Sequence, residues 1–375
     1  MRFPGFTDEW KKTTLGNECE IQMCKRILAQ QTNPNNGVPV FKIGTIGGNP
    51  DAYISLDLFK QFKEKYNYPQ QGEILISCAG TVGKCVRFDG APAYFQDSNI
   101  VWPRNYERTY TNDYLFYILS KQDWRHLNTT TIVRIYNDDL RSVKFSYPSI
   151  EEQKKITRLL SIVDERIETQ NKIIEDLKKL KSAIIDCHFN GRKANNRLGD
   201  LIHEVSNRNK RNTDLPVLSV SNRQGFIAQS EQFENRIIAS DDTSNYKIVI
   251  KNDFAYNPAR INVGSIARLV NYESGIVSPM YICFRCSDEI LPEYLELFFQ
   301  SRYFQLEVEK RLEGSVRQCL SIDGIKSIQF GILSISEQKV FAEKLKTIQT
   351  KLDNEETMNL LYQAKRKYLL SNMFI

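Results

Sequence analysis

Two long stretches of the chain carry apolar side chains at alternating steps of four and three positions. Steps that average 3.5 residues are typical of a helix that packs through a narrow seam against a second helix. The pattern therefore predicts two long seam-forming helices, one in the middle of the chain and one near its end. The seam positions are Ile156, Leu160, Val163, Ile167, Gln170, Ile174, Leu177, Lys181 and Ile184, and then Phe341, Leu345, Ile348, Leu352, Glu355, Asn359, Tyr362, Arg366 and Leu369.

The second helix repeats the first at a fixed separation. Each seam position of the second stretch lies 185 residues after its counterpart, and the fifth position is polar in both, Gln170 and Glu355. The segment before each helix repeats at the same separation: FSYPSIEEQKKI at 145–156 recurs as FGILSISEQKVF at 330–341. A separation that does not change over this length indicates a rigid element copied without insertions.

Upstream of the helices the separation drifts. It is 181 between Gly83 and Gly264, and 177 between Pro39 and Pro216. A drifting separation is typical of globular domains whose loops have gained and lost residues. The chain is therefore a tandem duplication of one domain and one helix.

Each globular half shows short β-rich runs followed by a helical run, which predicts an α+β domain. In the first half we expect strands at 38–46, 73–78, 84–88 and 98–101 and a helix at 112–120. In the second half we expect strands at 215–220, 253–256, 265–269 and 280–284 and a helix at 292–300.

The predicted fold class is α+β, with two globular domains separated by two long antiparallel coiled-coil helices in a pseudo-twofold tandem repeat. The helices are expected to pair because two seams in one chain can bury their apolar residues against each other. We expect a first domain at 1–150, a central helix at 151–189, a second domain at 190–335 and a C-terminal helix at 336–375.

Composition narrows the class of protein. Among 375 residues, 41% are hydrophobic and 26% are charged, which is typical of a folded globular protein. The chain has no run of 18 apolar residues, and Met1 leads into a charged segment, so we expect neither a membrane span nor a secretory signal. We interpret the eight cysteines as reduced thiols of a cytoplasmic protein. The net charge of +6 is compatible with nucleic acid without establishing it.

Three motifs come close to catalytic or metal-binding patterns and fall short of them. Cys283 and Cys286 form a single C-x-x-C, and no second pair follows it. The segment CAGTVGKC at 78–85 lacks the first glycine and the final hydroxyl of a phosphate-binding loop. NPAR at 257–260 begins like the N-P-P-[YF] motif of amino-methyltransferases but has no aromatic residue. We therefore predict a protein that binds rather than catalyses, with no catalytic and no metal-binding residue.

The duplicated junction and helix resemble the specificity subunits of type I restriction-modification enzymes. The first copy matches the family pattern at Pro148, Glu152, Gln153, Ile156, Asp164, Ile167, Lys172, Ile173, Leu177, Lys178, Lys181 and Phe189. The second copy matches at Glu337, Gln338, Asp353, Leu361 and Phe374, and departs from the pattern at Leu333 and Phe341. Trp10 and the segments 76–83 and 257–264 also resemble elements of the family.

The resemblance implies a function and a set of partners. The two globular domains would be target-recognition domains that bind double-stranded DNA at a bipartite target, and the helices would be spacers. Two modification (methyltransferase) subunits and two restriction/translocase subunits would dock on the chain. S-adenosylmethionine, ATP and magnesium would bind to those partners, and this chain would bind no cofactor. The alternative is a non-enzymatic coiled-coil scaffold with two ligand-binding heads.

Reading DNA requires side chains that reach base edges: Arg or Lys for guanine, Asn or Gln for adenine, and Ser or Thr for either. Predicted loop positions of these types supply the candidate DNA-binding residues. They are Lys42, Thr45, Lys84, Arg87, Thr130 and Arg134 in the first domain, and Ser221, Asn222, Arg223, Asn257, Arg260, Asn262, Ser315 and Arg317 in the second.

Overall fold

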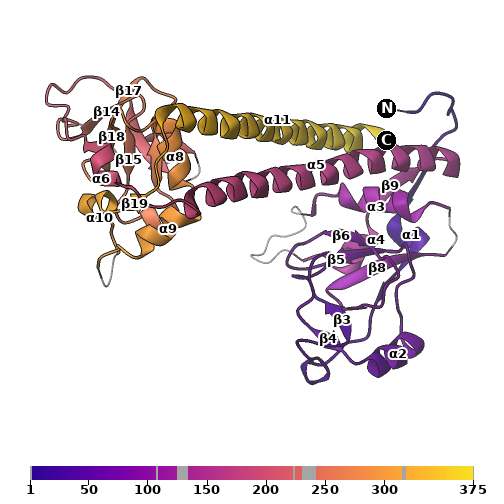
Figure 1. Ribbon diagram of the computed structural model, residues 1–375. Helices are drawn as coiled ribbons and strands as arrows, with labels where there is room; N and C mark the ends of the chain where they lie inside the picture. The colour runs from indigo at the N-terminus through magenta and orange to yellow at the C-terminus, as the bar shows by residue number, and fades with distance from the viewer. Residues whose placement is uncertain are drawn as a thin grey trace. The chain divides into compact units, whose positions relative to one another are not determined.

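The computed structural model describes residues 2–106, 109–124, 134–222, 224–229, 242–314 and 318–374. The chain divides into two compact units. Unit 1 comprises Met1–Thr169 and Met358–Ile375, and unit 2 comprises Gln170–Thr357. Two long helices, α5 (Ile150–Asn190) and α11 (Ile335–Met373), each contribute one part to each unit (Figure 1). The division of the chain into four segments that we predicted from the sequence stays a prediction.

Unit 1 is built around a four-stranded sheet with the order β2-β8-β5-β6 and a three-stranded sheet with the order β4-β3-β7. Strands β1 and β9 form a separate antiparallel pair. The elements are β1 (Lys11–Thr14), α1 (Leu15–Glu18), β2 (Cys19–Met23), η1 (Ala29–Gln31), β3 (Val38–Phe41), β4 (Tyr53–Ile54), α2 (Leu56–Lys65), β5 (Ile74–Ser77), β6 (Cys85–Arg87), β7 (Tyr94–Phe95), β8 (Ile100–Asn105), α3 (Asn112–Ser120), α4 (Asn137–Arg141) and β9 (Lys144–Tyr147).

Unit 2 repeats this plan with the sheet orders β11-β18-β15-β16 and β13-β12-β17-β14, and with β10 paired to β19. Its elements are β10 (Asn196–Arg197), α6 (Leu198–Leu201), β11 (Ile202–Glu204), β12 (Val217–Ser221), β13 (Gly225–Ala228), β14 (Lys247–Ile250), β15 (Phe254–Tyr256), η3 (Ile261–Val263), β16 (Ile266–Arg268), β17 (Ser274–Val277), β18 (Ile282–Cys286), α8 (Pro292–Phe299), α9 (Arg302–Glu309), α10 (Ile322–Lys326) and β19 (Gln329–Phe330).

The differences between the two units explain the drifting separation in the sequence. Unit 1 carries the helix α2 after β4, whereas unit 2 carries the strand β14 at the edge of its second sheet. Both units keep one parallel strand pair, β3 with β7 and β12 with β17. Changes in loop length therefore lie in the outer sheet and also after α3 and α8: the first residues of these two helices, Asn112 and Pro292, are 180 residues apart, whereas Ile135 and Leu320 are 185 apart. Both copies retain the four-stranded sheet next to the helices.

The predicted elements are present, and most strands are shorter than expected, although β8 is longer than the strand predicted at 98–101. The helix predicted at 112–120 is α3, and the strand predicted at 38–46 ends at Phe41, where a turn follows. In that turn the Thr45 hydroxyl accepts a hydrogen bond from the Lys42 backbone N–H at 2.9 Å. Hydrophobic residues beyond the strand belong to the loop, because Ile46 packs into the core without joining a ladder.

The seam of the long helices is buried as the 3.5-residue period predicts. In unit 1 the start of α5 contributes Ile156, Leu160 and Val163 to the core, and the end of α11 contributes Leu369 and Phe374 to the same core. In unit 2 the roles are exchanged: the start of α11 contributes Leu345, and the end of α5 contributes Ile185 and Phe189. Each unit is thus completed by the end of the helix that starts in the other copy.

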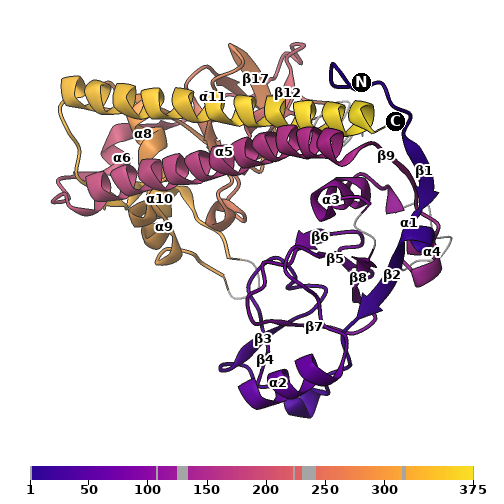
Figure 2. The ribbon, with the colours of Figure 1, turned by 90° about the vertical axis from the view of Figure 1, so that its right-hand side faces the viewer.

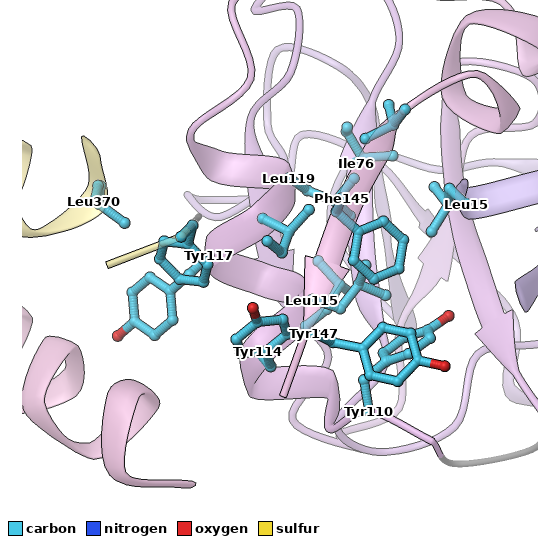
Figure 3. Packing of buried hydrophobic residues seen from close by; sticks show 14 of the residues in the cluster. Leu15, Ile76, Tyr110, Tyr114, Leu115, Tyr117, Leu119, Phe145, Tyr147 and Leu370 are labelled. Atoms are coloured by element: carbon cyan, nitrogen blue, oxygen red, sulfur yellow. The ribbon is translucent and has the colours of Figure 1, made fainter. Parts of the chain in front are cut away.

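Aromatic side chains fill the core of unit 1 beneath the helices. Tyr110 packs against Phe145 and Tyr147, with ring centroids 5.4 and 5.8 Å apart, and Leu15, Ile76 and Leu119 close the cluster (Figure 3). The α11 end reaches this core through Leu370, which Figure 3 shows on the α3 side of the cluster near Tyr117. Burial of these large rings adds to the hydrophobic stabilisation that the aliphatic residues of the cluster provide.

A buried carboxamide joins each long helix to its domain. The Gln153 side chain is fully buried and donates from Nε2 to the backbone oxygens of Pro148, at 2.9 Å, and Thr109, at 3.2 Å. Its Oε1 accepts a hydrogen bond from the Thr111 backbone N–H at 2.9 Å. One side chain therefore satisfies three backbone groups, which fixes the start of α5 against the start of α3 (Figure 2).

We call this buried carboxamide, which bonds the start of the long helix to its domain, the joint. Unit 2 has the same joint. Gln338, also fully buried, donates to the backbone oxygens of Leu333, at 2.9 Å, and Glu289, at 3.0 Å, and accepts from the Leu291 N–H at 2.8 Å. The Glu-Gln pair of the sequence repeat therefore has a structural role at its Gln position. Leu333 takes the place of Pro148 without loss, because only its backbone oxygen takes part.

Close packing explains a second repeated dipeptide, Leu15-Gly16 and Leu198-Gly199. A Cβ atom added at Gly16 would lie 2.8 Å from Arg141 Cβ in α4, and one added at Gly199 would lie 3.0 Å from Lys326 Cβ in α10. Only glycine lets the short helix approach so near at both positions.

Several polar residues in the seam are paired with residues of the other helix. In unit 2 the two fifth positions meet: Gln170 Nε2 donates to the Glu355 backbone oxygen at 3.0 Å and also to its carboxylate. In the same unit Lys181 Nζ donates to Gln349 Oε1 at 2.8 Å. In unit 1 Arg366 forms an ion pair with Asp164 at 2.5 Å, and these residues are the repeat counterparts of Lys181 and Gln349. Such pairs fix the register of the two helices.

We predict that removing one buried carboxamide loosens only the unit that contains it. Gln153→Ala leaves three backbone groups of unit 1 without partners, and buried unsatisfied groups cost about 1–3 kcal/mol each. Urea unfolding followed by tryptophan fluorescence should show a lower midpoint for Gln153→Ala, because the three tryptophans, Trp10, Trp102 and Trp124, all lie in unit 1. The control is Gln363→Ala on the exposed face of α11. Equal midpoints for the two variants would contradict the role of the joint.

We expect a partly buried histidine to make unit 2 sensitive to acid. His188 stacks on Phe341, with ring centroids 3.6 Å apart, and its Nε2 is 2.9 Å from the Tyr294 hydroxyl. Burial, together with nearby Arg192, lowers the pKa of His188 from its usual 6.5 to about 4. The unfolded chain therefore takes up a proton below pH 6.5 that the folded chain takes up only near pH 4.

We predict that the free energy of unfolding falls between pH 6.5 and pH 4 through this residue. The neutral variant His188→Gln should lose less stability than the unchanged chain when urea unfolding, followed by circular dichroism, is compared at pH 7.5 and pH 5. The same loss in both proteins would show that His188 does not carry the acid sensitivity.

Candidate nucleic-acid interface

Three segments of unit 1 meet at one end of its four-stranded sheet. They are the turn after β3, the β5–β6 loop and the segment before α4. The Ile135 N–H donates to the Cys78 backbone oxygen at 2.8 Å, and Lys84 Nζ donates to the Ile46 backbone oxygen at 2.6 Å. These two bonds bring together loops that carry four candidate residues, Lys42, Thr45, Lys84 and Arg134.

The same three segments meet in unit 2. The Leu320 N–H donates to the Pro258 backbone oxygen at 3.0 Å, which joins the segment before α10 to the β15–β16 loop. The Ser265 hydroxyl donates to the Val220 backbone oxygen at 3.3 Å, which joins that loop to the end of β12. Leu320 is the repeat counterpart of Ile135, so one hydrogen bond is formed at the same place in both domains.

Positive-φ glycines shape the loop of unit 1. Gly80 and Gly83 have φ values of 68° and 78°. A Cβ atom at Gly83 would lie 2.2 Å from Trp124 Cδ1, so this position is closed to every other residue. The glycines that make residues 78–85 similar to a phosphate-binding loop are thus explained by the backbone conformation of this loop. In unit 2 Gly264, with φ of 86°, ends the corresponding loop.

Some candidates of the first domain are already engaged by neighbouring side chains. Lys42 pairs with Asp51 at 2.9 Å, and both side chains are partly exposed. Arg87 donates to Asp113 at 2.8 Å and lies over the Phe116 ring, 3.7 Å from its centroid. Arg268, the counterpart of Arg87 in unit 2, likewise pairs with Glu293. The repeated pair indicates that Arg87 holds β6 to α3, although this does not test a contact with DNA.

Of the five candidates of the second domain that the structure describes, three are exposed. They are Asn222, Arg260 and Asn262. Within the part of the chain that the structure describes, the Arg260 guanidinium makes no hydrogen bond or ion pair. Asn257 has a local role, because its Oδ1 accepts a hydrogen bond from the Ala259 N–H at 3.0 Å. Ser221 accepts a weak bond from the Gln224 N–H at 3.4 Å.

Four candidates lie outside the described residues: Thr130, Arg223, Ser315 and Arg317. One residue of suitable chemistry was missed by sequence reasoning. Gln224 is exposed beside Ser221 in the β12–β13 turn and carries the amide that pairs with adenine. The Arg-Gln-Gly run at 223–225 is the signal that could have identified it, since a turn glycine places its neighbours at a loop tip. All fourteen candidates stay predictions.

The thiols of Cys283 and Cys286, in β18 of unit 2, are poorly reactive. Cys283 is fully buried and Cys286 partly so, and burial raises the pKa of each thiol to about 12. A neutral thiol is a poor metal ligand and a poor nucleophile. Among the described residues there is no group of three His, Cys, Asp or Glu side chains that could hold a metal ion. In the same residues no helix has the length and apolarity required to cross a membrane.

The fold and its repeated loop clusters define a duplicated α+β protein. Comparison with known proteins relates part of the chain to a family. Residues 7–179 match the family model of the type I restriction modification DNA specificity domain. A type I restriction enzyme specificity subunit of Haemophilus influenzae is 47% identical over 171 residues, which are 45% of this chain and 44% of that protein. The chain therefore matches less than half the length of this relative.

Other relatives match over nearly the whole chain. The MjaX specificity subunit of Methanocaldococcus jannaschii is 22% identical and covers 96% of this chain and 95% of its own length. The crystal structure of the S subunit from M. genitalium has a TM-score of 0.60 at 18% identity, with 98% of this chain and 96% of that chain covered. A chain from a study of assembly and conformational transition in the type I R-M system has a TM-score of 0.57 at 13% identity, with 99% and 98% covered. These two structures share the fold.

Residues 7–179 thus match the DNA specificity domain family of type I restriction-modification systems, and nearly the whole chain shares the fold of solved S subunits of such systems. Subunits of this family are non-catalytic.

Proposed function

We propose that this chain recognises a bipartite DNA target, one half through each domain, and holds the modification and restriction subunits of a type I enzyme on it. The observation that carries the proposal is the repeated loop cluster. The same backbone hydrogen bond, Ile135 to Cys78 and Leu320 to Pro258, supports a group of loops in both domains. The side chains on those loops differ between the domains.

A shared backbone arrangement with different side chains suits a protein that recognises two different DNA sequences. A common backbone frame can enter a groove of the duplex in the same way twice, while different side chains select different bases. Lys84 and Arg134 in the first domain and Asn222, Arg260 and Asn262 in the second are the types that pair with guanine or adenine. Phosphate contacts would fix the register, and base contacts would give the sequence.

The partners follow from the family. Two modification subunits would bind S-adenosylmethionine, two restriction/translocase subunits would bind ATP and magnesium, and this chain would bind none of these cofactors. A chain that acts on chromosomal DNA would work in the cytoplasm. A purified chain without its modification subunits should therefore neither methylate nor cut DNA.

The second candidate function is a coiled-coil scaffold whose two heads bind ligands other than DNA. It is favoured only by the modest net charge of +6. The two functions differ in the response to salt, because binding through phosphates weakens steeply as salt rises and binding of a neutral ligand does not.

We predict that exchanging one domain changes one half of the target. Residues 1–150 would be replaced by the same domain of another family member, and methylated adenines would be mapped across the genome of cells that carry the exchanged chain. The half-site read by the second domain should be unchanged, and the other half should become that of the donor. A change in both halves would contradict the assignment of one domain to one half-site.

We predict that Arg260→Ala weakens binding by about 1–3 kcal/mol if the guanidinium makes a bidentate contact with guanine. Binding would be measured by fluorescence anisotropy on the mapped target and on a target altered at one base pair. Arg158→Ala, on the exposed surface of α5, removes the same charge and is the control. An equal loss on every sequence would make Arg260 a phosphate contact, and no loss would remove it from the interface.

A further inference from the structure

Two neighbouring cavities of unit 1 share Lys121, and cations line both. A cavity of about 470 Å³ lies between the end of α3, the β1–β9 pair and Phe374, and Lys12 and Lys144 line it with Lys121. A cavity of about 670 Å³ lies between the end of α3 and the last turns of α11, where Arg366 and Lys367 join Lys121. Neither cavity has an Asp or Glu among its lining residues. We name the surface formed by these five cations the lysine cleft.

Strand geometry explains how the lysines come together. In the β1–β9 pair Lys12 lies opposite Ser146, and Lys144 lies opposite Thr14. Side chains alternate between the faces of a strand, so Phe145 and Tyr147 enter the core while the two lysines share the outer face. Diagonal neighbours on one face lie about 7–8 Å apart, near enough for the two charges to repel each other.

Lys121 adds a third positive charge without a counter-charge. Its ammonium lies over the Phe374 ring, 5.0 Å from the centroid, and it forms no ion pair within the described ranges. Burial alone lowers the pKa of Lys121, and no carboxylate raises it. Arg366, by contrast, is neutralised by Asp164. Three like charges around one cavity destabilise each other unless an anion lies between them.

Unit 2 does not repeat the lysine cleft. The counterparts of Lys12, Lys121 and Lys144 are Asn195, Ser301 and Gln329. Asn195 there bonds to the backbone of Ile332, and the fully buried Ser301 hydroxyl accepts from the Phe304 N–H at 3.2 Å. These polar residues complete the fold of unit 2, whereas the three lysines of unit 1 make no bond of this kind among the described residues.

We propose that the lysine cleft binds phosphate groups of duplex DNA without reading its sequence. This inference rests on the proposed function. The cleft is connected to the loops of the candidate nucleic-acid interface in the same unit. Trp124, three residues after Lys121, packs against Gly83 at the end of the β5–β6 loop. A duplex held by those loops has a phosphate on each strand about every 3.4 Å, which supplies anions near the cleft.

The alternative occupant is an acidic surface of a modification subunit. Two copies of such a subunit would bind to repeated features of this chain, because equal partners require equivalent surfaces. The lysine cleft exists in one repeat only. It therefore fits duplex DNA, which is one continuous ligand, better than a modification subunit that binds in two copies. The first domain would then contribute more of the salt-dependent affinity for DNA than the second.

The test compares two triple variants of the full chain. Lys12→Gln, Lys121→Gln and Lys144→Gln together remove the charge of the cleft. Lys339→Gln, Lys344→Gln and Lys346→Gln remove the same charge from exposed positions of α11 in unit 2. A fluorescein-labelled duplex of about 30 base pairs and arbitrary sequence is titrated from 50 to 200 mM NaCl, since non-specific binding depends on phosphate contacts. Unfolding midpoints in urea show that both variants are folded.

The cleft variant should bind about tenfold or more weakly at 50 mM NaCl, and its slope of log K against log salt should be shallower by about 0.9 for each phosphate that the protein no longer neutralises. The control variant should keep the slope of the unchanged chain. Equal slopes for all three proteins, or an equal loss of affinity in the control, would overturn the inference and leave the proposed function intact. Loss of association with the modification subunit at an unchanged DNA slope would assign the cleft to a protein partner. An unchanged chain that does not bind the duplex at 50 mM NaCl would overturn the proposed function as well.

Discussion

The arrangement of each unit depends on one buried carboxamide. Gln153 and Gln338 bond to three backbone groups each, so the first turn of the long helix, the preceding strand and the short helix of the domain meet at a fixed angle. A carboxamide has both a donor and an acceptor at its tip, and it carries no charge that burial would penalise. Loops on the domain can therefore vary while the helix keeps its direction. This division between a fixed joint and variable loops is what a protein with a changeable binding specificity requires.

Much of the fold could be predicted from the sequence because it depends on periodic packing. The seam of α5 and α11 follows from spacing alone, and the constant separation of 185 residues reflects a joint that tolerates no insertion. Strand ends were harder to place. The run from Val38 to Ile46 has the pattern of one strand, yet the Thr45 hydroxyl bonds to Lys42 and turns the chain after Phe41. Local side-chain bonds of this kind compete with a ladder and leave little trace in hydrophobic pattern.

The candidate interface was less predictable than the fold. Residue type and loop position brought Lys84, Arg134, Arg260 and Asn262 into two structurally equivalent clusters, but they could not distinguish a side chain that reaches outward from one that holds the domain together. Arg87 is the example: its chemistry suits guanine, and its guanidinium bonds to Asp113 and covers Phe116. The difference lies in contacts between β6 and α3, residues 26 apart in the sequence, and neither residue type nor local spacing indicates such a contact.

The exchange of helix ends between the two repeats has a consequence for the order of synthesis. The core of unit 1 includes Leu369, Leu370, Met373 and Phe374, which leave the ribosome after every other part of that unit. The first of the two domains to be translated is thus the last to have its hydrophobic core completed, while the core of unit 2 is complete once Ile348 has emerged. Until then unit 1 exposes an apolar surface where the end of α11 will pack, and domains in that condition are prone to aggregate or to need a chaperone. Removal of residues 369–374 alone would therefore damage the domain that is translated first.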